Sequence, residues 1–346
     1  MDTRTPVTAA SVVIVAAILM AIIVGAVAVL HLDIYGEGSS RTPPGPDTDP
    51  TTPDAIDPAL IRYRQTGEIP VSMQPVRALA VGPEDRIYVA GDKQIHVFDP
   101  GGEKSAEVKL EIEPRCLAVG GPDHQSPGRI YVGGKDRIAV YDLDGAHQAT
   151  WDSLGEGALL TSVGVAEQDV FAADMGNRIV LRYDTSGQLV GRIGARDAKR
   201  RIPGFMITTP YFDLAVAPDK LLSVVNPRRL CIETYTFDGD LELEWGEASS
   251  KVDGFFGCCN PAHFAILPDG RYVTAEKGIS RVKIYNDAGE FECVVAGPAQ
   301  LAVREDEVLA DVAADSRGRI LILDPRAGGV LIFEPKPSEK GAPDES

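Results

Sequence analysis

Side chains that can bind a metal or act as nucleophiles recur at one position of a repeated apolar segment. The six copies read ALAV from Ala78, CLAV from Cys116, SVGV from Ser162, DLAV from Asp213, HFAI from His263 and DVAA from Asp311. Carboxylates, imidazoles and thiolates are the usual protein ligands of divalent metals. The candidate ligand site is therefore Cys116, Ser162, Asp213, His263 and Asp311, of which Asp213, His263 and Asp311 are the candidate metal ligands.

Two interpretations of this series are open. In the first, the side chains converge on a divalent metal or another small ligand. In the second, an Asp that starts a strand caps backbone donors, and the polar residues simply line a wet channel mouth. A metal site needs converging geometry as well as ligand types, so the sequence alone favours the second interpretation. The cofactor is left unknown, with a divalent metal as the candidate.

A second chemical feature is GFFGCCNPAH, residues 254–263, which contains the adjacent cysteines Cys258 and Cys259. Three interpretations compete: a vicinal disulfide that stiffens the loop, thiolates that join His263 on a metal or haem-type centre, and disulfides to other cysteines. An exposed pair rarely stays reduced in an oxidising compartment, and adjacent cysteines close only a strained, reducible ring. This pair is the redox or disulfide candidate.

Two charged segments are also candidates for function. Glu276, Lys277 and Arg281 form either a surface ion network or part of the channel mouth, and the network is favoured because charged residues mostly lie at the surface. The segment RDAKRR, residues 196–201, is interpreted as a solvated loop, with a docking site for an acidic partner as the alternative.

The elements that position these residues are repeats of one unit. Its clearest copy, residues 162–194, has four short apolar or alternating runs separated by Gly, Asp and Asn. That pattern predicts a four-stranded antiparallel sheet, and the six copies predict a six-bladed β-propeller. Small residues two positions into each inner strand suit a crowded central axis: Ala80, Ala118, Gly164, Ala215, Ala265 and Ala313. Residues two earlier share that face, so the candidate side chains are expected at one end of a central channel.

The repeat resembles the NHL family of propellers in the segments DRIYVAG, DMGNRIVLRYDTSG and DLAVAP. The resemblance covers roughly residues 60–336 and implies an all-β, six-bladed fold without implying one activity, since such propellers include scaffolds, sensors, lyases and lactone hydrolases. The lactone hydrolases hold calcium with Glu, Asn and Asp; Asp213, Asp311 and Asn260 are the counterparts here, and no entry Glu is evident. The amidating lyases use channel histidines, of which only His263 is in place.

Closure of the ring requires a strand from outside the sixth repeat, because that repeat stops after three strands. The segment Glu68 to Ser72 precedes the first repeat and is predicted to supply the missing outer strand. Pro70 fits an outer edge, where a missing N–H donor is tolerated.

The remaining segments divide the 346-residue chain. Residues 1–8 are a short flank, and the uncharged apolar run 9–30 is long enough to cross a bilayer as an uncleaved signal-anchor helix. Residues 26–28 mimic a cleavage site. Residues 31–59 are a Pro- and Asp-rich linker, 60–336 the propeller and 337–346 a tail; the linker and the tail are expected to be disordered. The more positive short flank predicts a single-pass protein of the cytoplasmic membrane with its propeller on the periplasmic side.

The sequence points to two classes of function. A net charge of −17 argues against nucleic acid as a partner. The first hypothesis is a membrane-tethered extracytoplasmic binding or assembly module for an envelope or redox complex, with a protein or small ligand at the channel mouth. The alternative is a metal-dependent hydrolase or lyase. The motifs of P-loop proteins, serine hydrolases, zinc fingers and zinc proteases are absent, which favours the binding module and leaves enzymatic activity open.

Overall fold

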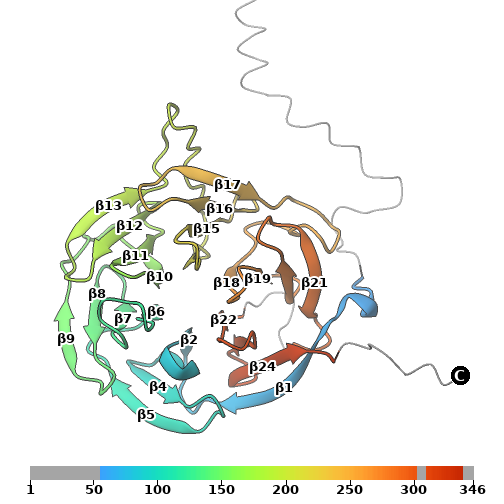
Figure 1. The fold of residues 1–346 in the computed structure, drawn as a ribbon, viewed down its shortest axis with the longest axis horizontal. Helices are drawn as coiled ribbons and strands as arrows, with labels where there is room; N and C mark the ends of the chain where they lie inside the picture. Colours follow the sequence, from blue (N-terminus) through green and yellow to red (C-terminus); the bar gives the residue numbers. More distant parts are fainter. Residues whose placement is uncertain (1–54, 302–308, 338–346) are drawn as a thin grey trace, which may run out of the picture. The chain divides into compact units, whose positions relative to one another are not determined.

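Six four-stranded antiparallel sheets surround a central axis in residues 55–301 and 309–337, the part of the chain that the computed structural model describes (Figure 1). From the axis outward, the first three blades contain β2 (Val76–Val81), β3 (Ile87–Gly91), β4 (Gln94–Phe98) and β5 (Lys104–Lys109); β6 (Cys116–Val119), β7 (Ile130–Gly133), β8 (Ile138–Tyr141) and β9 (His147–Thr150); and β10 (Leu160–Val165), β11 (Asp169–Asp174), β12 (Ile179–Asp184) and β13 (Leu189–Ile193). The last three contain β14 (Leu214–Val216), β15 (Leu222–Asn226), β16 (Cys231–Tyr235) and β17 (Leu241–Trp245); β18 (His263–Ile266), β19 (Tyr272–Glu276), β20 (Arg281–Tyr285) and β21 (Phe291–Ala296); and β22 (Asp311–Ala314), β23 (Ile320–Asp324), β24 (Gly329–Pro335) and β1 (Tyr63–Pro70). The predicted six-bladed propeller is confirmed.

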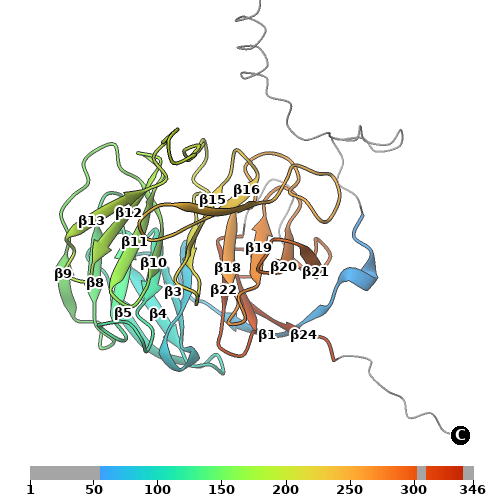
Figure 2. The same ribbon diagram turned by 45° about the horizontal axis from the view of Figure 1, so that its top comes forward.

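The position of a strand within its blade decides its burial. Blades stand side by side around the axis (Figure 2), so the middle strands have a neighbouring blade on each face. Every residue of β3 and β7 is accordingly buried. The outer strands face solvent, and β5 and β17 are largely exposed or alternate between partly buried and exposed residues. Continuous apolar runs therefore mark middle strands, and alternating or polar runs mark outer strands.

Turn chemistry explains why the third strand of each of the first five repeats is followed by a Gly. In the third blade, the carboxylate of Asp184 accepts hydrogen bonds from the backbone N–H groups of Ser186 and Gln188. Gly187 lies between them with φ of 90°, a conformation that favours glycine. A Cβ there would also collide with the indole of Trp151 on the neighbouring blade, so this glycine serves both the hairpin and the contact between blades.

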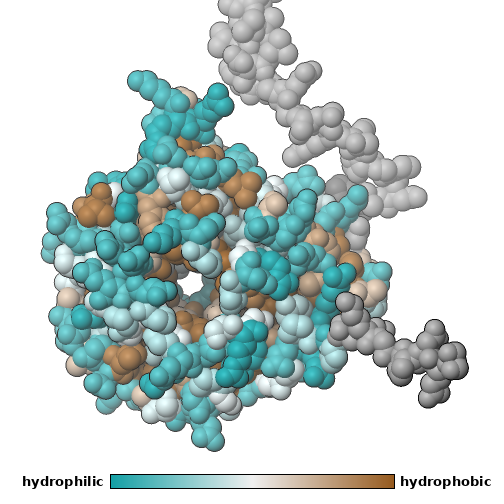
Figure 3. All heavy atoms as spheres, viewed as in Figure 1, coloured by the Kyte–Doolittle hydropathy of each residue, from teal (hydrophilic) through white to brown (hydrophobic). Residues whose placement is uncertain are grey.

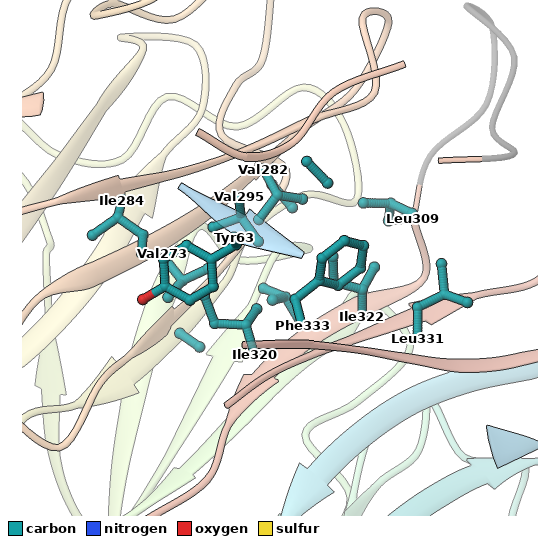
Figure 4. Packing of buried hydrophobic residues seen from close by; sticks show 14 of the residues in the cluster. Tyr63, Val273, Val282, Ile284, Val295, Leu309, Ile320, Ile322, Leu331 and Phe333 are labelled. Carbon is teal, nitrogen blue, oxygen red and sulfur yellow. The ribbon is translucent and has the colours of Figure 1, made fainter. Parts of the chain in front are cut away.

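The apolar core lies between adjacent blades, as Figure 4 shows for the last two. Val273 and Ile284 of the fifth blade face Ile320 and Phe333 of the sixth, and Tyr63 of β1 enters the same cluster. Tyr63 is 5% exposed, although it belongs to the N-terminal strand. The closing strand is thus packed into the core and also paired at an edge.

Ring closure by an N-terminal strand is confirmed, with different bounds. The closing strand is β1, Tyr63–Pro70, paired antiparallel with β24 from Tyr63 opposite Pro335 to Pro70 opposite Gly329. It starts five residues before the predicted segment, and Ser72 lies outside it. Its apolar alternation is interrupted by an irregularity in register between Gln65 and Gly67. This interruption explains why the sequence pattern revealed only its second half.

The folded part also begins slightly earlier than predicted. A short 3-10 helix, η1 (Pro58–Leu60), precedes β1, and the carboxylate of Asp57 accepts a hydrogen bond from the N–H of Ala59. The predicted membrane helix at residues 9–30 and most of the linker and tail lie outside the described residues. Within the described residues, no helix has the length and apolar character needed to cross a membrane.

Candidate functional site

A cavity of about 250 Å³ occupies the centre of the ring, where Figure 3 shows an opening on the face in view. Its walls are the inner strands of all six blades and residues next to them. All five predicted ligand residues line it: Cys116, Ser162, Asp213, His263 and Asp311. The shared strand position of these residues thus corresponds to a shared place on the cavity wall. The cavity is small enough to hold an ion or a small molecule.

Asp213, His263 and Asp311 converge on one side of this cavity. Nδ1 of His263 lies 3.6 Å from an oxygen of Asp213 and 3.9 Å from an oxygen of Asp311. The three side chains are 13–21% exposed, so they are shielded and still reachable from the cavity. The strands that carry them, β14, β18 and β22, are successive inner strands, which is why residues far apart in the sequence meet here.

The two carboxylates also tie neighbouring blades together. Asp213 accepts a hydrogen bond of 3.0 Å from the N–H of Phe264 in the next blade. Asp311 accepts one of 2.8 Å from the N–H of Leu79, across the junction that closes the ring. The hydroxyl of Ser162 makes the equivalent contact, because it accepts a hydrogen bond of 3.3 Å from the N–H of Leu214 in the next blade. The interpretation that these residues cap backbone donors is therefore correct for three of the positions.

Capping does not use the full capacity of these groups, because each carboxylate oxygen has two lone pairs. One candidate ligand atom from each of Asp213, His263 and Asp311 lies within 4.8 Å of the other two. In an octahedral site, adjacent ligand atoms lie about 3 Å apart, so a small inward movement would complete three positions around a cation. The residues fit a divalent ion of open coordination. The same carboxylates also fit an ammonium group.

Protonation makes this wall sensitive to pH near neutrality. Burial and the nearby charge of Asp213 raise the pKa of Asp311 to about 7, although His263 acts in the opposite direction. Burial acts to lower the pKa of His263, but the two carboxylates outweigh it and raise that pKa above its ordinary value. As the pH falls through neutrality, Asp311 loses negative charge and His263 gains positive charge. Both changes weaken the attraction of this wall for cations.

Other members of the predicted ring contribute less polar character. Cys116 is buried against the neighbouring strand, and burial raises the pKa of its thiol well above the ordinary value. It is therefore a small apolar group at neutral pH, a role that free cysteines often have. The structure adds Arg77 and Arg115, which line the same cavity. Arg77 lies in β2 and Arg115 directly precedes β6, so each comes one residue before a repeated channel position, Ala78 or Cys116. Sequence reasoning from metal-ligand types does not detect them.

The adjacent cysteines are not joined to each other in the structure. All five cysteines are free, with Cys258 exposed and Cys259 buried. Disulfides to the other cysteines are likewise not formed, because Cys116, Cys231 and Cys293 are buried at separate places. Within the described part of the chain, the cluster of potential metal ligands that contains His263 includes neither Cys258 nor Cys259. The interpretation of a shared thiolate and histidine centre is not supported.

The interpretation of Glu276, Lys277 and Arg281 as a surface ion network is wrong. Glu276 and Arg281 are each 1% exposed and form an ion pair of 2.6 Å. Lys283, fully buried, lies 3.3 Å from the same carboxylate. The three come from β19 and β20. Arg281 and Lys283 donate to the carbonyl of Gly254 in the loop before β18, and Glu276 accepts from the N–H of Phe256 in the same loop. Lys277 alone stays at the surface. The cluster fixes that loop against the fifth blade.

The basic segment 196–201 is a hairpin-like excursion between β13 and β14, with Asp197 and Ile202 bridged by backbone hydrogen bonds. Arg200 pairs with Asp240 of the fourth blade at 2.6 Å, and both side chains are exposed. Such a pair contributes little to stability. The segment is therefore a solvated loop held to its neighbour by one salt bridge, in line with the favoured interpretation.

Known proteins resemble this chain in fold. No protein-family model matches the chain, and no curated protein matches it in sequence. Solved structures do match. A streptogramin B lyase shares 12% identity with a TM-score of 0.53, over 81% of this chain and all of that one. A selenomethionine-substituted virginiamycin B lyase from Staphylococcus aureus shares 11% identity with a TM-score of 0.52, over 76% of this chain and 82% of that one.

A third similar structure is a catalytically inactive His-to-Ala variant of virginiamycin B lyase from Staphylococcus aureus with quinupristin. It shares 14% identity with a TM-score of 0.50, over 77% of this chain and 82% of that one. Identities this low establish a shared architecture and no more. The NHL resemblance stays a prediction. The chain is a six-bladed β-propeller similar in fold to these lyases.

Proposed function

We propose that this chain is a binding module whose small ligand occupies the mouth of the central channel, with a cationic group of the ligand at Asp213 and Asp311. The observation that carries the proposal is the convergence of these carboxylates with His263 on the wall of a 250 Å³ cavity. Arg77 and Arg115 line the same cavity and supply positive charge for an anionic group. A small zwitterion, such as an amino acid or an amino sugar acid, has both groups.

A metal-dependent lyase or hydrolase is the second candidate. In this candidate, a divalent ion takes one ligand atom from each of three side chains: the carboxylates of Asp213 and Asp311 and the imidazole of His263. The similar solved structures are lyases, and one of them is inactive when a histidine is replaced. Against this candidate, His263 is the single histidine among the described residues that line the cavity. A lyase would then depend on this histidine for both ion binding and proton transfer, or on other residues for one of them.

One titration separates the two candidates. The full-length chain, purified without added metal, is titrated calorimetrically with small zwitterions in the presence of chelator. Separate samples without chelator are titrated with calcium, magnesium, manganese and zinc salts. The binding module predicts that a zwitterion binds without metal. Its affinity should fall about tenfold between pH 8 and pH 6, because Asp311 takes up a proton near pH 7 and His263 gains charge. The lyase candidate predicts one equivalent of metal, lost in His263→Ala.

Matched variants show whether binding occurs at the channel. Asp311→Asn should weaken the binding of a zwitterion about tenfold and abolish most of its pH dependence. Asp238→Asn, which changes an exposed carboxylate on the outside of the fourth blade, should change neither. Equal effects of the two variants would place the ligand elsewhere. If no zwitterion and no metal binds, the polar side chains of the channel serve only to join neighbouring blades, which would favour an assembly scaffold.

The tethered location is a further part of the proposal. The apolar run at residues 9–30 is long enough to span a bilayer, and the more positive short flank favours a propeller on the periplasmic side. A washed membrane fraction should retain the full-length chain after treatment with alkaline carbonate, whereas a chain without residues 1–49 should be released. Protease added to spheroplasts should degrade the propeller. Full protection from protease, or release of the full-length chain, would contradict the tether or its orientation.

A further inference from the structure

The adjacent cysteines lie in an environment that differs from that of every other cysteine in the protein. Burial raises the pKa of the thiols of Cys116 and Cys231 well above the ordinary value and that of Cys293 to about 11. Burial acts in the same direction on Cys259, but hydrogen bonding with Thr208 and Cys258 and the charge of Lys277 outweigh it and lower its pKa. The thiolate is the reactive form of a cysteine, so the lowered pKa prepares Cys259 to attack a disulfide formed at the neighbouring Cys258.

The geometry around the pair explains this difference. Sγ of Cys259 lies 3.6 Å from the hydroxyl oxygen of Thr208, and Nζ of Lys277 lies 4.0 Å from Sγ of Cys258. Cys258 is exposed, so a molecule in solution reaches it directly. Cys259 lies beneath it and is 2% exposed. The pair therefore has an outer thiol beside a cation and an inner thiol held by hydroxyl contacts.

The loop that carries the pair is held in place from below. The amide of Asn260 donates to the carbonyls of Phe256 and Lys277 and accepts from the N–H of Lys277. The N–H of Phe256 donates to the buried carboxylate of Glu276 at 3.2 Å. These bonds join the loop to β19 on both sides of the cysteines. The relative positions of the two thiols and of Lys277 are therefore set by the fold and do not depend on a bound partner.

The pair also lies close to the proposed binding site. The ring of Tyr211 contacts the imidazole of His263 edge to face, with centroids 6.2 Å apart. Nζ of Lys277 lies 5.7 Å from the centroid of the same ring. Tyr211 thus separates the channel residue His263 from the cation next to Cys258. The outer thiol is thus connected to the channel residue His263 through Lys277 and Tyr211.

We propose that Cys258 and Cys259 form a reversible thiol–disulfide exchange site for small-molecule disulfides and thiols, with Cys258 as the attacking thiol and Cys259 as the resolving thiol. The Cys258 thiolate attacks one sulfur of the disulfide, forming a mixed disulfide and releasing one thiolate, which takes up a proton. Cys259 then attacks the sulfur of Cys258, which forms the Cys258–Cys259 disulfide and releases the second thiolate. The protein loses two electrons and two protons, and the substrate leaves as two thiols.

The cycle is complete only if the new disulfide can be reduced again. Adjacent cysteines close a strained ring, and strained disulfides have high reduction potentials and are readily reduced. A dithiol or an excess of monothiol therefore returns the pair to the free form seen in the structure. The eight-membered ring that adjacent cysteines close is therefore expected to open readily in the presence of thiols. This property favours exchange over a structural role for the pair.

Mass spectrometry of the full-length chain tests the proposal, with oxidised glutathione as the probe. The reduced protein is incubated with the probe, quenched with an alkylating reagent and digested. The expected product is a peptide that contains Cys258 and Cys259, has lost two hydrogen atoms and is not alkylated. In Cys259→Ser, a glutathionyl adduct should accumulate on Cys258 because no resolving thiol is present. In Cys258→Ser, formation of any adduct should be slower than in the native chain by about a hundredfold, since Cys259 is buried.

Two further variants test the roles given to the surroundings. Lys277→Met should slow the first step about tenfold, and Lys277→Arg should restore most of the rate, a pattern that a purely structural lysine would not produce. Cys231→Ala removes a buried cysteine far from the loop and should leave the rate unchanged. The proposal is overturned if the native chain stops at a stable mixed disulfide, or if its Cys258–Cys259 disulfide resists reduction by excess monothiol. The native-chain result holds even if a cysteine variant fails to fold.

Discussion

A chain that begins at Ser72 is expected to aggregate instead of folding, although it retains all strands of the first five blades. The truncation removes β1, whose pairing with β24 extends from Tyr63 to Pro70. It also removes Tyr63 and Ile69 from the core, where they are 5% and 2% exposed. Burial of each such side chain contributes about 1.5–3 kcal/mol, and the lost backbone pairing adds to this. The sum approaches the net stability of a typical domain, about 5–15 kcal/mol.

Loss of β1 also has a consequence for association. Without it, β24 presents a row of unpaired N–H and C=O groups next to an opened apolar cluster, and such an edge pairs with other chains. Size-exclusion chromatography and near-UV circular dichroism should show large assemblies without fixed tertiary packing. The matched control is a chain that begins at Pro50, which keeps β1 and should be monomeric and folded. A folded, monomeric product from the shorter chain would show that the ring does not need this strand.

Glu276→Ala is expected to lower the free energy of unfolding by about 3–5 kcal/mol, because it leaves two buried cations without their counter-charge. Arg281 and Lys283 both contact the Glu276 carboxylate, at 2.6 and 3.3 Å, and all three are at most 1% exposed. The carboxylate also accepts the N–H of Phe256, so the variant removes a contact that holds the cysteine loop. Urea unfolding followed by tryptophan fluorescence measures the loss. Glu167→Ala is the control, because it breaks an exposed pair with Lys220 and should cost about 0–1 kcal/mol.

The loss should depend on pH in a defined direction. Burial lowers the pKa of Lys283 to about 7, and the charge of Arg281 acts in the same direction, while Glu276 opposes them. In the native protein the folded state therefore holds fewer protons than the unfolded chain between about pH 7 and the ordinary lysine pKa, so stability increases with pH over that window. In the variant Lys283 sheds its proton even more readily, and its neutral amine tolerates burial. The deficit should be smaller at pH 9 than at pH 6, and an equal deficit at both would contradict this account.

Local patterns in the sequence were sufficient for the blades, the turns and the ring of candidate ligands. An Asp, Asn or Thr at the end of the third strand and a Gly three residues later define the hairpin in the first five repeats, as Asp184 and Gly187 show. Because side chains alternate along a strand with a period of two, the position of Asp213 relative to Ala215 places its side chain toward the axis. Each of these properties depends on a few consecutive residues, which is why the sequence alone determined the propeller and the level of the channel mouth.

Contacts between distant segments decided the rest, and no local pattern encodes them. The start of β1 depends on a strand more than 260 residues later. The charged residues on β19 and β20 are typical of a solvated face. In the structure they are buried, and a hydrogen bond from Arg281 to the carbonyl of Gly254, 27 residues earlier, offsets part of the free-energy cost of burying the charge. The reactivity of Cys259 depends on Thr208, 51 residues earlier. A side chain's charge, exposure and nucleophilicity follow from its partners in space, so only the tertiary structure determined the buried ion cluster, the closing strand and the thiol pair beside the channel.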